Sequence, residues 1–209
     1  MTAGKRVYRS PLREEQARHT RAAVLDAAGR CFLDRGYAAT TMRDIAEAAG
    51  VSVQTVFGQG SKAALLLGCV DRAVVGDDED VALAAREPFL RLMEAPDVAG
   101  KLAAFRDLAR RYIPQTSPIA VVFAAAATGD PEIAGAWEEY ERRRRADARV
   151  LVGSMEPWLR DGLDVETATD ILWGVFSDGP IEALMRRRNW TLDRYLDFLV
   201  DAVERLLLR

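Results

Sequence analysis

Apolar residues recur along most of the chain at the spacing of amphipathic helices. The clearest stripe lies near the N-terminus and places apolar side chains at i, i+3, i+4, i+7 and i+8: Val24, Ala27, Ala28, Cys31 and Phe32. Similar patterns predict helices at about 62–75, 81–94, 97–113, 132–160 and 192–208, whereas no segment alternates between apolar and polar residues as a strand does. The pattern therefore predicts an all-α fold.

Prolines and glycines mark the expected ends of these helices. Pro114 is expected to end one helix and Pro118 to begin the next, because proline removes a hydrogen bond inside a helix but is tolerated in its first turn. The apolar run IAVVFAAAA after Pro118 is expected to be buried on nearly all sides. Gly129-Asp130-Pro131 precedes the long helix, Asp164 begins another, and Gly179-Pro180 is expected to kink or break it.

Two further helices, in the stretch TTMRDIAEAAGVSVQTVFGQGSK, are short but well capped. Thr41, with Asp44 three residues later, resembles a capping box. Gly50 can adopt the left-handed conformation that ends a helix, and Ser52 can cap the next one. Neither helix is long enough to be stable alone, so the arrangement predicts a helix-turn-helix that holds one exposed face at the angle of the DNA major groove. The alternative is an ordinary helical hairpin with good caps.

The second short helix carries side chains that could read DNA bases. Gln54 can form paired hydrogen bonds with adenine, and Val53 or the Thr55 methyl group can contact a thymine methyl. The capped helix N-termini favour phosphates. We therefore predict that DNA is contacted by Arg6, Arg9, Arg13, Thr41, Arg43, Ser52, Val53, Gln54, Thr55, Phe57 and Lys62.

Charge is distributed unevenly, although the net charge of the 209-residue chain is only -3. Residues 1–62 carry ten Lys and Arg against six Asp and Glu, so this end is basic and the rest of the chain is acidic. A basic end suits a protein that approaches a polyanion from one side, and its first residues suit an arm that follows the DNA backbone or enters the minor groove. The alternatives are a chance asymmetry and a solvated tail without a partner.

The remaining composition narrows the class of protein. Cys31 and Cys69 are too few for a disulfide framework and suit a reducing cytoplasm. The N-terminus lacks the apolar region of a secretory signal, and no apolar run reaches the roughly 20 residues of a membrane span. The single histidine, His19, has no cysteine or carboxylate cluster near it, and no nucleophile motif or phosphate-binding glycine loop is present. We expect a cytoplasmic protein that is not an enzyme and has neither cofactor nor metal.

These features resemble the N-terminal region of the tetracycline-repressor-like (TetR-type) transcriptional regulators. The resemblance rests on Ala22–Phe32, Gly36-Tyr37, Thr40-Thr41, Ile45-Ala46, Ala49–Ser52, Thr55–Phe57, and Ser61-Lys62 with Leu65-Leu66. It implies a three-helix DNA-binding head and a C-terminal helical domain that binds a ligand and dimerises, which the closing WTLDRYLDFLVDAVERLLL also resembles. We therefore expect a basic flexible arm at 1–17, a helix-turn-helix domain at 18–62, and a ligand-binding and dimerisation domain at 63–209.

The sequence departs from the family pattern directly after the second short helix. The family has a Tyr, two variable residues, a Phe and one further residue before Ser-Lys, whereas this chain has Phe57-Gly58-Gln59-Gly60 before Ser61-Lys62. Phe57 lacks the hydroxyl that the family tyrosine offers to a phosphate. The turn also lacks an aromatic anchor, which would contribute about 1.5–3 kcal/mol if buried. We therefore predict a head that is softer than is usual in the family and, at the extreme, one that orders only on DNA.

The last predicted helix has more apolar surface than one buried face needs, because Phe198 and Leu207 lie beside its main stripe. One side is expected to face the core and the other a second copy of the chain, whose two recognition helices would then lie about one DNA turn apart on a near-palindromic operator. The alternative is that both sides lie in the core of a monomer. The predicted dimer-interface residues are Leu172, Leu192, Tyr195, Leu196, Leu199, Val203 and Leu206.

Aromatic residues on the middle helices could line an apolar ligand cavity, although aromatic residues at helical spacing are more often plain core. The predicted lining residues are Phe89, Phe105, Tyr112, Phe123, Trp137, Tyr140, Trp173 and Phe176. We interpret Arg142–Arg145 as a solvated helix face rather than an anion site.

The favoured function is a ligand-responsive transcriptional regulator, a repressor that binds a palindromic operator as a dimer and is released by a small apolar molecule. The alternative is a ligand-binding helical dimer whose DNA-binding head is weakened or non-functional. The expected partners are double-stranded operator DNA, an unidentified small-molecule effector and a second copy of the chain, with no membrane.

Overall fold

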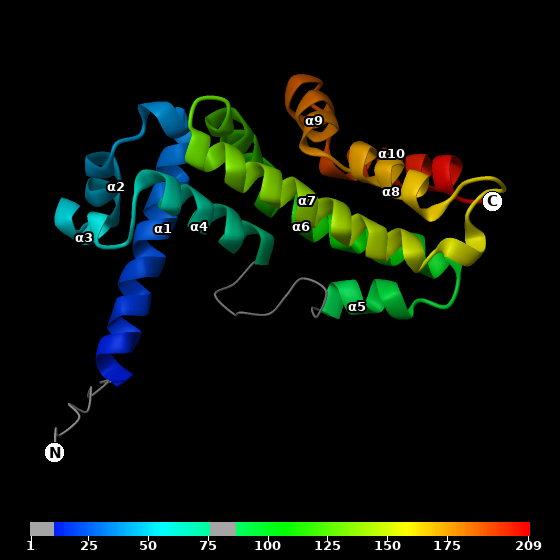
Figure 1. Ribbon diagram of the computed structural model, residues 1–209, viewed down its shortest axis with the longest axis horizontal. Coiled ribbons are helices and arrows are strands. Elements are labelled where there is room, and N and C mark those ends of the chain that lie inside the picture. Colours follow the sequence, from blue (N-terminus) through cyan, green and yellow to red (C-terminus); the bar gives the residue numbers. More distant parts are fainter. Residues whose placement is uncertain (1–10, 76–86) are drawn as a thin grey trace, which may run out of the picture. The chain divides into compact units, whose positions relative to one another are not determined.

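The computed structural model describes residues 11–75 and 87–209, and the regular elements of these ranges are helices (Figure 1). The described β-structure is limited to one isolated bridge between Leu159 and Leu208, so the all-α prediction is confirmed. No helix in these ranges is both long and apolar enough to span a membrane. The helices are α1 (Pro11–Ala39), α2 (Met42–Ala49), α3 (Val53–Phe57), α4 (Lys62–Val75), α5 (Glu87–Glu94), α6 (Val98–Ala127), α7 (Pro131–Gly153), the 3-10 helix η2 (Glu156–Trp158), α8 (Val165–Val175), α9 (Asp178–Ile181), the π-helix η3 (Glu182–Arg187) and α10 (Leu192–Leu207).

The chain divides into two compact units, Met1–Cys69 and Val70–Arg209. The boundary lies within α4, whereas the sequence analysis placed it between residues 62 and 63, at the start of that helix. Residues 11–17, which we expected in a flexible arm, belong to α1. Residues 1–10 lie outside the described residues, and the expectation of a basic arm there stays a prediction.

The predicted apolar stripe of α1 forms the core of the first unit, with Val24, Ala27, Ala28 and Phe32 closed to solvent. Gly36 takes a φ of 77°, which interrupts the helical backbone where the sequence predicted an end. Thr40 follows in a buried position. Its hydroxyl donates to the carbonyl oxygens of Cys31, at 3.0 Å, and Gly36, at 2.8 Å, and so satisfies the end of α1.

The predicted caps of the next three helices are present. Thr41 and Asp44 form a complete capping box, in which Asp44 N–H donates to Thr41 Oγ1 over 3.1 Å and Thr41 N–H donates to Asp44 Oδ2 over 2.9 Å. Gly50 ends α2 with a φ of 66°. Ser52 accepts a hydrogen bond from Thr55 N–H at 3.0 Å, and Ser61 accepts one from Ala64 N–H at 3.1 Å. These contacts fix where each helix begins, as their sequences predicted.

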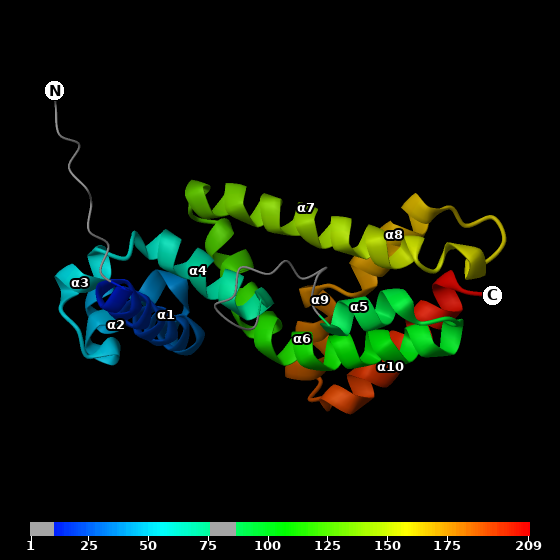
Figure 2. The ribbon, with the colours of Figure 1, turned by 90° about the horizontal axis from the view of Figure 1, so that it is seen from below.

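The second unit is built around one apolar core to which α5, α6, α7, α8 and α10 contribute. α6 contacts α5, α7 and α10, and Figure 2 shows α5 and α10 alongside it. α7 ends at Gly153, earlier than predicted, and is followed by η2. The predicted break is present, but it lies at Phe176-Ser177: α8 ends at Val175, and Gly179 and Pro180 belong to α9, which is followed by η3.

The prediction that Pro114 ends one helix and Pro118 begins another is wrong, because α6 continues through both prolines. Each proline removes a backbone hydrogen bond at a cost of about 3 kcal/mol in general. Apolar side chains on both sides of the prolines, including Ile113, Ile119 and Phe123, are buried. Their burial on one continuous helix outweighs the local cost.

The predicted dimer stripe belongs to the core of a single chain. Leu172, Tyr195, Leu196, Leu199 and Val203 are buried within the second unit, and the partly buried Leu192 packs against the same core. Their place in a dimer interface stays a prediction. α10 contacts α6 and α8, which cover its apolar face. Of the predicted set, Leu206 is exposed, as is the neighbouring Phe198.

Candidate functional site

The first candidate site is the outer edge of α3. Val53 and Phe57 are 38% and 60% exposed, and Gln54 is also exposed. Val56, one residue before Phe57, is closed to solvent. α3 therefore buries one side chain and presents the predicted base-reading side chains outward.

The turn between α2 and α3 holds this edge in place. Val51 N–H donates to Ala46 O over 3.1 Å, and the buried side chains of Ile45 and Ala46 face the core of the unit. Thr55 is half-buried, and its hydroxyl is hydrogen bonded to the Ser52 hydroxyl at 2.8 Å. Thr55 and Ser52 thus contribute to the cap of α3, while Val53, Gln54 and Phe57 form the exposed edge.

The predicted basic contacts are placed differently from one another. Arg43 is exposed on α2, as a phosphate contact requires. Arg13 lies in α1, but its side chain is outside the described part of the chain, as are residues Arg6 and Arg9. The Lys62 amine turns inward and donates to the carbonyl oxygens of Tyr37 and Thr40, each at 3.0 Å, with the Tyr37 ring 4.3 Å away. The structure therefore gives Lys62 a role inside the first unit, where the sequence analysis placed it on DNA.

The shortened turn after α3 is held by polar contacts instead of a buried aromatic ring. Gln59 N–H donates to Val56 O over 2.9 Å, and Gly60, with a φ of 133°, donates its N–H to Phe57 O over 3.2 Å. An Arg21 guanidinium nitrogen donates to Gln59 O over 3.2 Å and so connects the turn to α1. The softness of this head stays a prediction, which amide hydrogen exchange at residues 57–62 tests.

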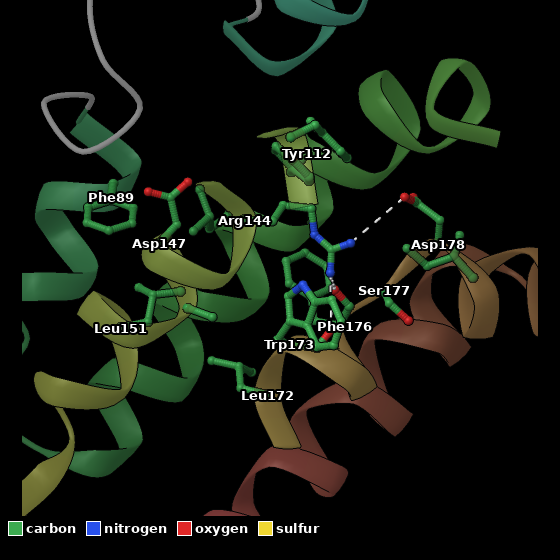
Figure 3. A pocket seen from close by; sticks show the side chains of 14 residues that line it. Phe89, Tyr112, Arg144, Asp147, Leu151, Leu172, Trp173, Phe176, Ser177 and Asp178 are labelled. Carbon is green, nitrogen blue, oxygen red and sulfur yellow. Dashed lines mark hydrogen bonds and ion pairs between the residues drawn. The ribbon is translucent and has the colours of Figure 1, made fainter. Parts of the chain in front are cut away.

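The second candidate site is a cavity within the second unit (Figure 3). Its volume is about 60 Å³, counted as the space open to the centres of water-sized spheres. One water needs at least about 10–15 Å³ by this measure, so the cavity admits a small molecule. It is lined by Phe89, Leu108, Tyr112, Tyr140, Arg144, Asp147, Ala148, Leu151, Leu172, Trp173, Phe176, Ser177, Asp178 and Ile181.

Five of the eight aromatic residues predicted for a cavity line this one: Phe89, Tyr112, Tyr140, Trp173 and Phe176. The other three are placed behind the lining. Phe105 packs edge-on against Phe176, with ring centres 5.6 Å apart, and Phe123 packs against Trp137 and Tyr140. Those three support the aromatic wall rather than form its surface.

Arg144 was predicted to lie on a solvated face, and this is wrong: it lines the cavity, and its side chain is only 13% exposed. One guanidinium nitrogen donates to Trp173 O at 3.1 Å and to Phe176 O at 2.9 Å, which are carbonyls at the end of α8. The other donates to Glu141 at 3.3 Å and lies 4.0 Å from Asp178. Arg144 therefore fastens α7 to the end of α8. Its neighbours Arg142 and Arg143 are exposed, as predicted.

Two acidic side chains that the sequence analysis missed also line the cavity. Burial raises the pKa of Asp178 to about 6, which the Arg144 charge opposes and the Glu141 charge reinforces. Burial also raises the pKa of Asp147. Among the described residues, Asp147 makes no hydrogen bond and no ion pair. The indole N–H of Trp173 and the Oδ2 atom of Asp178 are buried without a hydrogen-bond partner.

No group of three or more His, Cys, Asp or Glu in the described ranges could hold a metal ion. The two sites offer groups suited to recognition: an exposed polar and apolar edge on one unit, and an aromatic cavity with charged groups in the other.

Comparison with known proteins finds a family model that matches the first site. The model of bacterial regulatory proteins of the tetR family matches residues 24–69, which include α2, α3 and the turn after them. The HTH-type transcriptional regulator TtgR of Pseudomonas putida is 48% identical over 44 residues. That match covers 21% of this chain and 21% of TtgR, so it spans about a fifth of the curated relative.

Solved structures match over most of the chain. NalD, the secondary repressor of the MexAB-OprM multidrug efflux pump in Pseudomonas aeruginosa, has a TM-score of 0.67 at 20% identity, covering 92% of this chain and 98% of NalD. The triclosan complex of SmeT, from Stenotrophomonas maltophilia, has a TM-score of 0.69 at 17% identity, covering 91% of this chain and 92% of SmeT. At these identities the likeness shows the shared fold. Residues 24–69 match the model of the tetR family of bacterial regulatory proteins, and the chain as a whole shares the fold of these solved regulators.

Proposed function

We propose that the protein is a DNA-binding transcriptional regulator whose affinity for DNA is controlled by a small molecule bound in the second unit. The observation that carries the proposal is the exposed edge of α3, where Val53, Gln54 and Phe57 project from a helix held by Ser52 and Val56. A helix in the major groove reads bases with such side chains. Arg43 on α2 would contact the DNA backbone and supply affinity that depends on salt.

The proposed effect on transcription is repression, which is the role of NalD and SmeT, two repressors of the same fold. The proposed operator is a near-palindrome bound by two copies of the chain, because a two-fold dimer presents two recognition helices to two half-sites. Most of the α10 stripe is covered by α6 and α8 of the same chain, which favours other side chains for that dimer. The exposed Phe198 and Leu206 on α10 are the side chains that we propose for it.

The proposed effector binds in the aromatic cavity and weakens DNA binding. A ligand shifts the affinity for DNA only if it binds the DNA-free and DNA-bound states unequally. The complex of SmeT with triclosan supports a small, largely apolar effector for that relative, and the apolar walls of the present cavity support the same choice here.

Selection of bound DNA from a random pool, using the full-length protein, tests this function. We expect a near-palindromic sequence to be enriched. Gln54→Ala should lower affinity for it by about 1–3 kcal/mol and relax the preference at one base of each half-site. Gln115→Ala changes an exposed glutamine on α6 and serves as the matched control.

A different outcome would favour the second candidate function, a ligand-binding protein with a weakened head. The observation behind that candidate is the turn after α3, where Phe57 is exposed and Gly58-Gln59-Gly60 lacks an aromatic anchor. Binding at low salt with equal affinity for all sequences, and no enriched site, would support it.

A further inference from the structure

The walls of the cavity are rich in aromatic rings. Phe89, Tyr112, Tyr140, Trp173 and Phe176 supply them from four helices and the end of α8. The Tyr112 and Tyr140 hydroxyls are hydrogen bonded to each other, and burial raises the pKa of both, so both stay neutral while their rings line the cavity. Aromatic faces carry negative partial charge and attract cations as well as apolar groups.

Among the described residues of the lining, Arg144 is the one cationic side chain, and it is already engaged. Arg144 donates to Trp173 O, Phe176 O and Glu141, lies 4.0 Å from Asp178 Oδ2, and has its guanidinium carbon 6.0 Å from the Trp173 ring centre. Binding an anion would require breaking these contacts, and the end of α8 would lose its anchor. Arg144 is therefore a structural cation of the cavity wall.

The described residues of the lining include two carboxyl groups, those of Asp147 and Asp178, and one cationic side chain, Arg144. Asp178 faces Arg144, whereas Asp147 has no hydrogen-bond or ion-pair partner in the part of the chain that is described. Figure 3 shows Asp147 beside Phe89 at one end of the lining, with Arg144 between it and Asp178. A half-buried carboxylate without a partner is costly in a protein unless a cation compensates it.

We propose that the cavity binds a small organic cation, whose positive charge lies against Asp147 and whose apolar groups pack against the surrounding rings. This proposal rests on the proposed function for the identity of the site, but it changes the chemical class of the effector from apolar to cationic. A neutral apolar molecule would fill the cavity and leave Asp147 unpaired. An anion would face Asp147 and Asp178, and among the described residues of the lining the Trp173 indole N–H is the unpaired donor.

The test compares two probes of the same shape, phenyltrimethylammonium and neutral tert-butylbenzene, by calorimetric titration of the full-length protein without DNA at about pH 8, where carboxyl groups are ionised. We expect the cation to bind at least about tenfold more tightly than the neutral probe, because both the charge attraction and the cation–ring attraction are lost with the nitrogen. The anion 4-tert-butylbenzoate should bind more weakly than either.

Variants of one side chain assign the preference to Asp147. Asp147→Asn should lower the ratio of cation to neutral affinity to about one, and Asp147→Glu, which keeps the charge, should retain most of it. Glu138→Gln removes the same charge from an exposed position of the same helix and is the control for long-range effects. Unchanged binding of tert-butylbenzene shows that the Asp147→Asn cavity is intact.

Equal affinity for the two probes, binding of neither, or an unchanged ratio in Asp147→Asn would each overturn the proposal. A separate DNA-binding titration keeps it distinct from the proposed function. If the cation binds with the expected preference but does not alter DNA affinity, the ligand class stands and the control of DNA binding fails. If tert-butylbenzene binds as tightly as the cation and weakens DNA binding as much, ligand control of DNA binding is supported and the proposal of a cationic ligand is refuted.

Discussion

Replacement of Lys62 by Met separates a structural role of this side chain from a role on DNA. Lys62 donates two hydrogen bonds of 3.0 Å to the carbonyl oxygens of Tyr37 and Thr40, and its amine lies 4.3 Å from the Tyr37 ring centre. These contacts join the start of α4 to the corner between α1 and α2. Met keeps the apolar stem of the side chain and removes only the amine, so the variant isolates these contacts.

The expected loss of stability follows from the contacts that disappear. A hydrogen bond to a charged donor contributes about 1.5–3 kcal/mol when buried, and a cation–ring contact about 0.5–1 kcal/mol. Because the Lys62 side chain is only half-buried, the lower ends of these ranges apply. The loss should therefore be about 3.5 kcal/mol. A change of that size makes the amides of α2 and α3 exchange roughly a few hundredfold faster if they exchange by opening of the first unit.

Hydrogen exchange of the full-length protein, read at the peptides that cover residues 41–57, measures this effect locally and does not need two-state unfolding of the whole chain. Arg43→Gln removes an exposed charge from α2 and should leave the exchange unchanged. In binding to operator DNA, Arg43→Gln should be the variant that changes the measurement and Lys62→Met the one that does not. Arg43→Gln should reduce the slope of log affinity against log salt by about one, and Lys62→Met should leave it unchanged. If Lys62→Met leaves the hydrogen exchange unchanged and reduces the slope of log DNA affinity against log salt, this reasoning is refuted. Lys62 would then contact a DNA phosphate, as the sequence analysis predicted.

Three further predictions concern both units. Burial raises the pKa of Asp178 to about 6 in the folded protein, whereas the same carboxyl group has a pKa of about 4 in the unfolded chain. Between these two pH values the folded protein keeps a proton that the unfolded chain has lost. The free energy of unfolding should fall as the pH rises through this window and stay low above it. Asp178→Asn should be more stable than wild type by up to about 3 kcal/mol at pH 8. Urea titrations in which both proteins show the same dependence on pH would contradict this. Arg144→Gln removes the anchor of α8 and should cost about 3 kcal/mol in the same assay, against less than about 0.5 kcal/mol for its exposed neighbour in Arg143→Gln. Gly50→Ala should lower the free energy of unfolding by about 1 kcal/mol, because Gly50 has a φ of 66°. Gly135→Ala, in a helix with open space around the glycine, should raise it by about 0.5–1 kcal/mol. Shifts of the melting temperature with the same sign and size in both variants would contradict both predictions.

The parts of the fold that depend on neighbouring residues could be predicted from the sequence. Thr41, Gly50 and Ser52 fix helix ends through contacts that reach three or four residues, and such contacts are visible in the sequence. Pro114 and Pro118 failed as helix ends for the opposite reason. Their local cost is overcome by the packing of side chains on either side of them, which lie in a core assembled from distant segments.

The stripe on α10 illustrates a second limit. Periodicity predicted correctly that Tyr195, Leu196 and Leu199 are buried, but it carries no information on what buries them. In the structure they are covered by α6 and α8 of the same chain. Apolar surface for a second copy has to be sought among residues that remain exposed after this packing, such as Phe198 and Leu206.

The charged residues of the cavity could have been found from the register of α7, which the run of four arginines obscured. At 100° per residue, Arg144, Asp147 and Leu151 all lie within about 40° of Tyr140, whereas Arg142 and Arg145 point well away from that direction. The predicted inward position of Tyr140 therefore implies that Arg144 and Asp147 also face inward. Burial of both charges on one face requires partners. Arg144 finds them on α8 and α9, whereas Asp147 finds none in the described part of the chain, and this imbalance is the reason to expect a cation in the cavity.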